Sequence, residues 1–190
     1  MDAPTQTPPP GYRDVSVPIE SLYRNKAVII GAILLAAVPI LVHVALIGGL
    51  DAFFSRAYGD NILLFLIWII LLILAHEVVH GFGWMTAGGV GPRYIRFGID
   101  RKTFSPYCHV TKPIRAAAYR YGAALPLVVT GILPLMVGLF TDAPMLTMLS
   151  AIMISAAVGD LFVLWVIREV PGNALVIDHP SQAGCYVKDV

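Results

Sequence analysis

The sequence has little charge. Asp, Glu, Lys and Arg make up only 13% of its 190 residues, whereas 57% are hydrophobic. A soluble domain usually carries about twice that charged fraction, so the composition excludes an ordinary soluble protein and indicates an integral membrane protein. Two cysteines, Cys108 and Cys185, are too few for a disulfide framework and are expected to be free thiols. Nothing in the sequence points to recognition of nucleic acid.

The first 18 residues lack the apolar side chains that a folded core requires, and five of them are proline. They also lack the basic start and short apolar core of a secretory signal. We therefore expect residues 1–18 to form a disordered or extended tail. Residues 19–190 are expected to form a single integral membrane domain.

Four long apolar stretches follow, at residues 27–50, 62–87, 121–140 and 145–167. A helix needs about 20 apolar residues to cross a bilayer, and each stretch is long enough. The sequence therefore predicts an all-α membrane protein with four transmembrane helices. The bilayer and the membrane proteins within it are the expected partners.

Lys and Arg are distributed unevenly between these stretches. Three precede the first stretch, one lies between the first and second, seven lie between the second and third, and none lies between the third and fourth. Because basic residues favour the cytosolic side, both termini and residues 88–120 are expected in the cytosol, with the chain crossing the cell's inner membrane several times. The basic residues are also expected to contact anionic lipid.

Two of the cytosolic segments have strand-like patterns. Residues 94–99 alternate between apolar and polar side chains, residues 107–111 can form a partner strand, and Ser105-Pro106 suits the loop between them. A similar pair occurs at residues 174–177 and 184–187. The sequence thus predicts small cytosolic β-hairpins, one within residues 88–120 and one within the tail of residues 168–190.

The strongest functional signal is His76-Glu77-Val78-Val79-His80, which lies inside the second apolar stretch. On a helix, His76 and His80 share a face, so both imidazoles can bind one metal ion. Zinc suits such ligands, and Glu77 beside them can act as the general base that takes a proton from water. Ionisable groups inside a span are costly and usually functional; a polar cluster that joins helices is the alternative.

Asp160 is the only acid in the fourth stretch and is the candidate third ligand. Counted from the cytosolic end of each helix at about 1.5 Å per residue, His76, His80 and Asp160 lie at a similar depth. A carboxylate beside a divalent cation is also neutralised, which removes the cost of burying it. We therefore expect one Zn²⁺ per chain, bound by His76, His80 and Asp160. A hydrogen bond that packs helices together is the alternative role for Asp160.

The other candidate ligands are weaker. His43 lies in the outer half of the first stretch and is expected to form a hydrogen bond between helices. His109, Asp178 and His179 lie on cytosolic segments, where such residues are common on the surface, and are not expected to bind the metal. The sequence identifies no substrate-binding residue.

The order of these residues resembles the site-2 protease class of intramembrane metalloproteases. That class carries His-Glu-x-x-His in one transmembrane helix and an aspartate ligand in a later one, which His76, Glu77, His80 and Asp160 match. The resemblance implies a zinc-dependent endopeptidase that cleaves a peptide bond in or near the transmembrane segment of membrane-protein substrates. The chain departs from the class in having Gly159 before its aspartate, where the class usually has Asp-Gly, and no nearby Asn.

A closer resemblance is to a bacterial family of zincin peptidases of unknown function. It covers most of the chain from about Leu64 onward. The matching segments are His76-Glu77-Val78-Val79-His80-Gly81, Gly159-Asp160, and Asp178-His179-Pro180 followed by Gly184-Cys185.

Two other classes of function remain open. In a metal or ion transporter, His76, His80 and Asp160 would form a transit site, but Glu77 would have no specific task. In a non-catalytic membrane adaptor, the motif would persist without activity. Transport into liposomes without proteolysis favours the transporter, and normal biological activity of a Glu77→Ala variant favours the adaptor.

The charge distribution predicts that Arg56 faces outside and Arg101 faces the cytosol. In a cysteine-free background, Arg56→Cys should react with a membrane-impermeant thiol reagent in intact cells, whereas Arg101→Cys should react only after the cells are permeabilised. Reaction of Arg101→Cys but not Arg56→Cys in intact cells would reverse the orientation.

Overall fold

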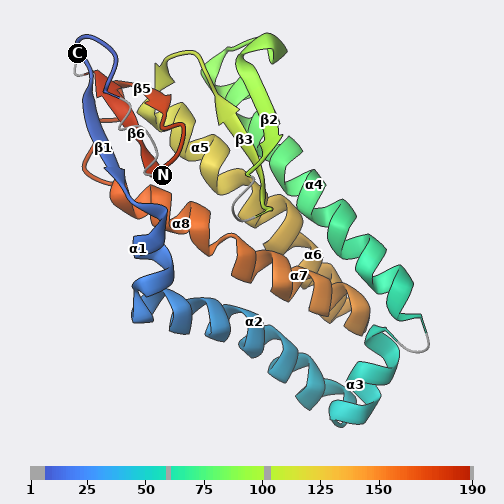
Figure 1. The fold of residues 1–190 in the computed structure, drawn as a ribbon. Helices are drawn as coiled ribbons and strands as arrows, with labels where there is room; N and C mark the ends of the chain where they lie inside the picture. The colour runs from blue at the N-terminus through green and yellow to red at the C-terminus, as the bar shows by residue number, and fades with distance from the viewer. Residues whose placement is uncertain (1–6, 59–60, 101–103, 189–190) are drawn as a thin grey trace.

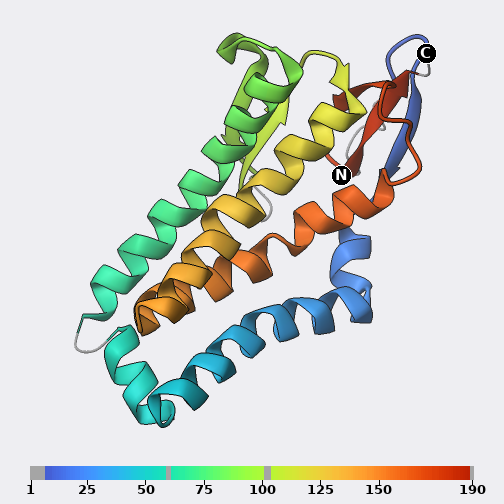
Figure 2. The ribbon, with the colours of Figure 1, turned by 180° about the vertical axis from the view of Figure 1, so that it is seen from behind.

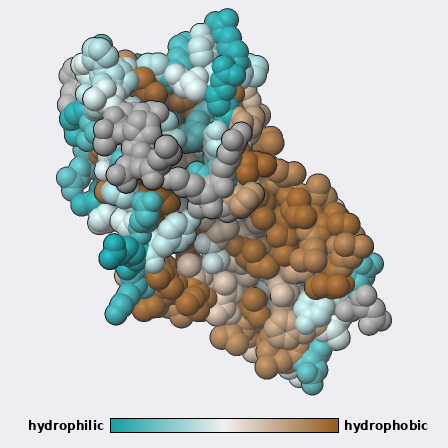
Figure 3. Space-filling view, viewed as in Figure 1, coloured by the Kyte–Doolittle hydropathy of each residue, from teal (hydrophilic) through white to brown (hydrophobic). Residues whose placement is uncertain are grey.

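The structure, a computed structural model, describes residues 7–58, 61–100 and 104–188. It is mostly helical, with long helices running side by side and two small antiparallel sheets gathered at one end (Figures 1 and 2). Apolar side chains form a broad band over the helices, while hydrophilic ones collect at the ends (Figure 3). This distribution is the one that a bilayer imposes on a protein that crosses it.

Four helical segments are long and apolar enough to cross a membrane. They are α2 (Lys26–Ile47), α4 (Ile62–Gly88), and the segments Ala116–Phe140 and Pro144–Val166. The four predicted helices are therefore confirmed, although the third begins at Ala116 rather than at residue 121. Two short helices that the sequence did not predict flank α2, namely α1 (Ile19–Arg24) and α3 (Leu50–Ala57).

The third and fourth long segments are each interrupted. The third comprises α5 (Ala116–Pro126), a π-helical turn η2 (Leu127–Ile132) and α6 (Leu133–Phe140). The fourth comprises α7 (Pro144–Ala156) and α8 (Val158–Val166), which meet at Ala157. Proline has no N–H to donate and disturbs the helical ladder around it, and Pro126 immediately precedes η2. Short π-helical turns within α-helices often occur at functional sites.

The first sheet contains the predicted pair of strands in the tail and two further strands. Its order is β1-β6-β5-β4, and all neighbours are antiparallel; the strands are β1 (Arg13–Val17), β6 (Ala183–Lys188), β5 (Leu175–Asp178) and β4 (Ile114–Arg115). The expectation of a disordered tail over residues 1–18 is therefore wrong for Arg13–Val17, which pair with β6 along their whole length. Residues 1–6 of that tail lie outside the described residues.

The second sheet is the hairpin predicted within residues 88–120, and the structure confirms it. After a 3-10 turn η1 (Pro92–Tyr94), β2 (Ile95–Ile99) pairs with β3 (Pro106–Val110) in antiparallel register from Ile95↔Val110 to Ile99↔Pro106. The hairpin packs against α4, where a Cβ added to Gly81 would come within 3.0–3.4 Å of Ile95, Phe97 and Cys108.

Both sheets lie at the same end of the long helices, and α3 lies at the other end (Figure 1). The segments before α2, between α4 and α5, and after α8 therefore share one side, as an even number of crossings requires. That this side is the cytosol remains a prediction from the Lys and Arg distribution.

At the opposite end, His43 joins α2 to α7, as expected for a hydrogen bond between helices. Its Nδ1 lies 2.7 Å from Thr147 Oγ1, and its Nε2 lies 3.1 Å from Asp142 Oδ1. Arg56 from α3 donates to Asp142 Oδ2 at 2.9 Å. The hydrogen bonds from His43 and Arg56 lower the pKa of the Asp142 carboxyl.

Helices α4 and α5 approach each other closely at two glycines. A Cβ on Gly83 would lie 2.7 Å from the Cα of Gly122, and a Cβ on Gly122 would collide with the indole of Trp84. Small residues allow transmembrane helices to pack at such short range. This contact sets how near the face of α4 that carries His76 and His80 comes to α5.

Candidate metal centre

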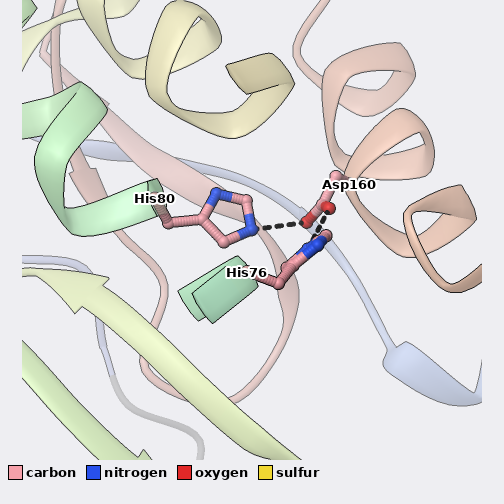
Figure 4. A group of neighbouring side chains, drawn as sticks. All are labelled: His76, His80 and Asp160. Atoms are coloured by element: carbon pink, nitrogen blue, oxygen red, sulfur yellow. Dashed lines mark hydrogen bonds and ion pairs between the residues drawn. The ribbon is translucent and has the colours of Figure 1, made fainter. Parts of the chain in front are cut away.

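The structure brings His76, His80 and Asp160 together. The two histidines lie one turn apart on α4 and are 7% and 5% exposed. His76 Nε2 is 3.0 Å from Asp160 Oδ2 and His80 Nε2 is 3.2 Å from Asp160 Oδ1, so both rings point at the carboxylate from α8 (Figure 4). One ligand atom from each residue lies within 4.8 Å of the others.

The orientation of His80 depends on a proline in α5. Pro126 has no N–H, so the carbonyl of Gly122, four residues earlier, loses its usual helical donor. His80 Nδ1 donates to this carbonyl oxygen at 2.9 Å. A carbonyl only accepts, so the hydrogen lies on Nδ1 and Nε2 presents a lone pair towards Asp160.

His76 is held in the same way by the π-helical turn. The Thr130 hydroxyl donates to the Pro126 carbonyl at 2.8 Å, which leaves its oxygen free to accept. His76 Nδ1 lies 3.3 Å from that oxygen. The hydrogen of His76 is therefore also on Nδ1, and its Nε2 lone pair faces Asp160. Such partners fix the tautomer of metal-binding histidines and orient their rings.

The donor set fits a metal ion. Because the Nδ1 atoms have partners of their own, each histidine in its neutral form offers an Nε2 lone pair on the side where the two Asp160 oxygens lie, at 3.0 Å and 3.2 Å. A cation between them satisfies all of these lone pairs at once. Imidazole and carboxylate with three protein ligands suit catalytic zinc, which keeps its fourth position for water or substrate.

Arg120 fixes the helix that carries Asp160. From α5, its guanidinium donates to the carbonyl oxygens of Ile167 and Val170 at 2.6 Å and 2.5 Å. These carbonyls follow the end of α8, where a helix leaves acceptors without partners. Arg120 was expected to orient the chain and contact lipid; in the structure it also links α5 to the end of α8.

An aromatic stack supports the site from the sheet side. The Trp84 ring lies parallel to His80 at a centroid distance of 5.4 Å and parallel to Tyr119 at 5.6 Å. Trp84 Nε1 donates to the Tyr119 carbonyl at 3.0 Å. The stack lies between α4 and α5, one helical turn beyond His80 in the direction of the sheets.

Glu77 faces away from this stack, towards the hairpin. It lines a groove of about 350 Å³ between α4 and the hairpin, at the end of β2 and the beginning of β3. The other lining residues are Leu74, Val78, Phe97, Gly98, Ile99, Pro106 and Tyr107. Among the described residues, no hydrogen bond to its carboxylate is formed. Glu77 is within electrostatic range of His76, His80 and Asp160, so it stands beside the metal group without belonging to it.

His109, Asp178 and His179, which were expected from the sequence to be ordinary surface residues, are largely buried or hydrogen-bonded. His179 is only 2% exposed, and its Nδ1 accepts from the backbone N–H groups of Ser181 and Gln182 at 3.1 Å and 2.9 Å. Asp178 bonds to His109 at 2.5 Å and to Tyr119 at 2.6 Å. None of these residues joins the group of His76, His80 and Asp160.

The two cysteines are buried free thiols on opposite sheets. Burial raises the pKa of each thiol, Cys108 and Cys185, to about 12. Both are therefore protonated near neutral pH, and neither is placed with the metal group.

A helical fold with four membrane-length helices and a group of two buried histidines and one aspartate indicates a membrane protein with a site that could hold a metal ion. The family model described as "Putative zincin peptidase" matches residues 69–175, more than half of the chain, and the chain belongs to this family. Membership indicates a metallopeptidase and makes zinc the expected metal. No curated protein and no solved structure matches the chain.

Two partners of the histidines were missed in the sequence. Thr130 is, apart from Tyr121, the only polar side chain in the third apolar stretch, but it belongs to no recognised motif, and the Gly122 carbonyl is not visible as a side chain at all. The available signal was Pro126, because a proline inside a span always leaves a carbonyl four residues earlier that needs a donor.

The geometry predicts how zinc content responds to substitution. Purified protein should hold about one zinc per chain, and His76→Ala, His80→Ala and Asp160→Ala should each lose it because two ligands bind zinc poorly. Metal analysis of detergent-purified protein measures this. Equal zinc in the His76→Ala variant would contradict the assignment.

Matched controls are available on neighbouring residues. Glu77→Gln should keep zinc, since Glu77 is not a ligand, and Asp178→Ala and His179→Ala should keep it as well. The third ligand would instead belong to the sheet under two conditions. Asp160→Ala would retain zinc, and Asp178→Ala or His179→Ala would lose zinc while remaining folded.

Proposed function

We propose that this protein is a zinc-dependent endopeptidase that cleaves a peptide bond in or near the transmembrane segment of membrane-protein substrates. The observation that carries the proposal is the convergence of His76, His80 and Asp160 inside the apolar band, with Glu77 directed into an adjoining groove. A metal site that serves transport gives Glu77 no task, whereas hydrolysis requires a base in that position.

The chemistry divides between the metal and Glu77. Zinc bound by His76, His80 and Asp160 would supply a Lewis acid that activates water and polarises the peptide carbonyl. Glu77 takes a proton from the attacking water as the new C–O bond forms. When the C–N bond breaks, Glu77 returns that proton to the leaving amine. Glu77 is suited to this exchange because no other hydrogen bond among the described residues engages it.

The hairpin offers a means of holding the substrate. A helical substrate hides its scissile bond, so the segment that is cut must be extended. The bond from Thr111 N to the Tyr94 carbonyl, just before β2, places the even-numbered residues Arg96 and Gly98 in hydrogen-bonded pairs with β3. The N–H groups of Phe97 and Ile99 therefore point away from β3, at the outer edge of β2, and both residues line the groove that contains Glu77.

An extended segment can pair with this free edge as an added strand. The side chains of Phe97 and Ile99 are 56% and 65% exposed and apolar, which suits a substrate that leaves the bilayer. A second, apolar groove of about 700 Å³ lies between α2 and the junction of α7 and α8, and Gly159, next to Asp160, forms part of its wall. Both grooves support access to the site from the membrane.

The proposal includes the orientation expected from Lys and Arg. Both termini and the hairpin then lie in the cytosol, and the site opens towards the cytosolic edge of the inner membrane. Substrates are membrane proteins whose segments can unwind at that edge.

The function is tested by comparing the proteomes of cells that carry the wild-type protein or Glu77→Gln. Membrane-protein fragments cut in or near a span should be present only with the wild type, because the variant keeps the zinc site and lacks the base. If both cell lines contain the same fragments, and the purified wild type cleaves none of the intact proteins, the proposal fails.

The role of the β2 edge is tested at Ile99. Ile99→Pro removes an N–H at the outer edge of β2 and leaves the bonds to β3, so cleavage of the substrates found above should fall by at least tenfold while zinc content stays constant. Ile99→Ala, which keeps the N–H and removes most of the side chain, is the matched control. Equal activity of Ile99→Pro and Ile99→Ala would exclude strand addition at this residue.

A further inference from the structure

A histidine and an aspartate from two different sheets form a close pair near the groove. His109 lies on β3, Asp178 ends β5, and His109 Nδ1 is 2.5 Å from Asp178 Oδ2. The other oxygen, Asp178 Oδ1, accepts from the Tyr119 hydroxyl at 2.6 Å. The Asp178 side chain is 10% exposed. Because each carboxylate oxygen has its own donor, Asp178 is fixed in place and fixes His109.

The pair is connected to the metal group by the aromatic stack. Tyr119, which donates to Asp178, lies parallel to Trp84, and Trp84 lies parallel to His80. All three rings are on α4 and α5, whereas Asp178 belongs to the sheet. The position of His109 is therefore set relative to the same two helices that position the metal ligands.

His109 stands beside the groove that contains Glu77. Its ring centroid is 4.6 Å from that of Tyr107, which lines the groove together with Glu77. The side chain of His109 is 27% exposed, so part of its ring is accessible to a bound molecule. Among the described residues, only Nδ1 of this ring is engaged in a hydrogen bond.

The surroundings favour the protonated form of His109. Burial by itself lowers the pKa of His109, but the hydrogen bond to Asp178 and the negative charges of Asp178 and Glu77 outweigh it, so the pKa is raised. Burial lowers the pKa of neighbouring His179, which therefore adds no positive charge near neutral pH. Arg96 lies opposite His109 on β2. The other titratable groups around His109 are Asp178, Glu77, Tyr119, His179 and Cys108.

We infer that His109 is a catalytic residue that donates a hydrogen bond from Nε2 to the carbonyl oxygen of the scissile peptide bond, with Asp178 as its positioning residue. The inference rests on the proposed function. As water adds to the carbonyl carbon, negative charge develops on the oxygen, and a fixed donor aimed at it stabilises the transition state. Glu77 only accepts once it is ionised, so the groove needs a separate donor. A buried aspartate that holds a histidine by Nδ1 leaves Nε2 for this task.

The experiment uses the full chain, zinc-loaded in detergent, with fluorescein-labelled casein as the cleavage probe. His109→Leu should lower kcat about 10²–10³-fold, the usual loss for one such donor, with little change in KM or zinc content. His109→Gln, which keeps an N–H donor, should recover part of this loss. Thr111→Val, which removes a side-chain hydroxyl two residues from His109 and outside the groove, is the matched control and should stay close to wild type.

The pH profile separates a chemical role from a structural one. Activity of the wild type should fall at high pH as His109 loses its proton. This alkaline limb should be absent in His109→Gln, which does not titrate. In Asp178→Asn the limb should move to lower pH, because the charge that raises the pKa of His109 is gone.

Binding provides a second readout that needs no turnover. A peptide phosphinate resembles the tetrahedral, negatively charged transition state, whereas a peptide hydroxamate binds zinc without that geometry. By isothermal titration, His109→Leu should bind the phosphinate at least tenfold more weakly than wild type does and bind the hydroxamate equally well.

The outcomes distinguish this inference from the proposed function. If the wild type cleaves casein and binds the phosphinate, but His109→Leu does both equally well, the inference is wrong and the function stands. A loss confined to Thr111→Val would likewise overturn it. If the wild type neither cleaves nor binds, the proposed function and the inference both fall.

Discussion

A backbone carbonyl inside a bilayer has no water to bond to, and a proline in a span leaves one such carbonyl without its helical donor. In this protein Pro126 leaves the Gly122 carbonyl free, and His80 from α4 supplies the donor. This hydrogen bond between α4 and α5 is possible only because Gly83 and Gly122 let the two helices approach so closely. One local defect in α5 thus sets the tautomer of His80, and the π-helical turn that follows it supplies Thr130 for His76.

The third member of the metal group is positioned by a different means. Asp160 lies in the first turn of α8, just after the interruption at Ala157. Arg120 closes the far end of α8 by binding the carbonyls of Ile167 and Val170. Since Arg120 and Gly122 are neighbours on α5, the same helix holds one end of each ligand-bearing element. Helix α5 and the π-helical turn that follows it provide no candidate ligand, yet their contacts position His76, His80 and the helix that carries Asp160.

Local sequence patterns predicted much of this fold. The length of the apolar stretches predicted the four spans, and strand-like patterns predicted a hairpin in each sheet. The spacing of His76 and His80 predicted that they share a face of one helix. Depth counted along two spans brought Asp160 to the same level, which the structure matches. The patterns failed where the cause is not local. Arg13–Val17 have too few apolar residues to fold alone, but β6 supplies their hydrogen bonds. Asp178 looked like a surface residue, and only the meeting of β3, β5 and α5 buries it.

Strand β1 is the first described element of the chain and pairs with β6, the last one. All four long helices lie between these two strands in the sequence. During synthesis, β1 leaves the ribosome well before its partner, and the two histidines of α4 precede Asp160 by two spans. A chain whose synthesis has reached only α4 therefore carries the His-Glu-x-x-His segment but lacks Asp160, Asp178 and the partner strand of β1. The group of His76, His80 and Asp160 and the four-stranded sheet can be completed only after the last long helix has been made.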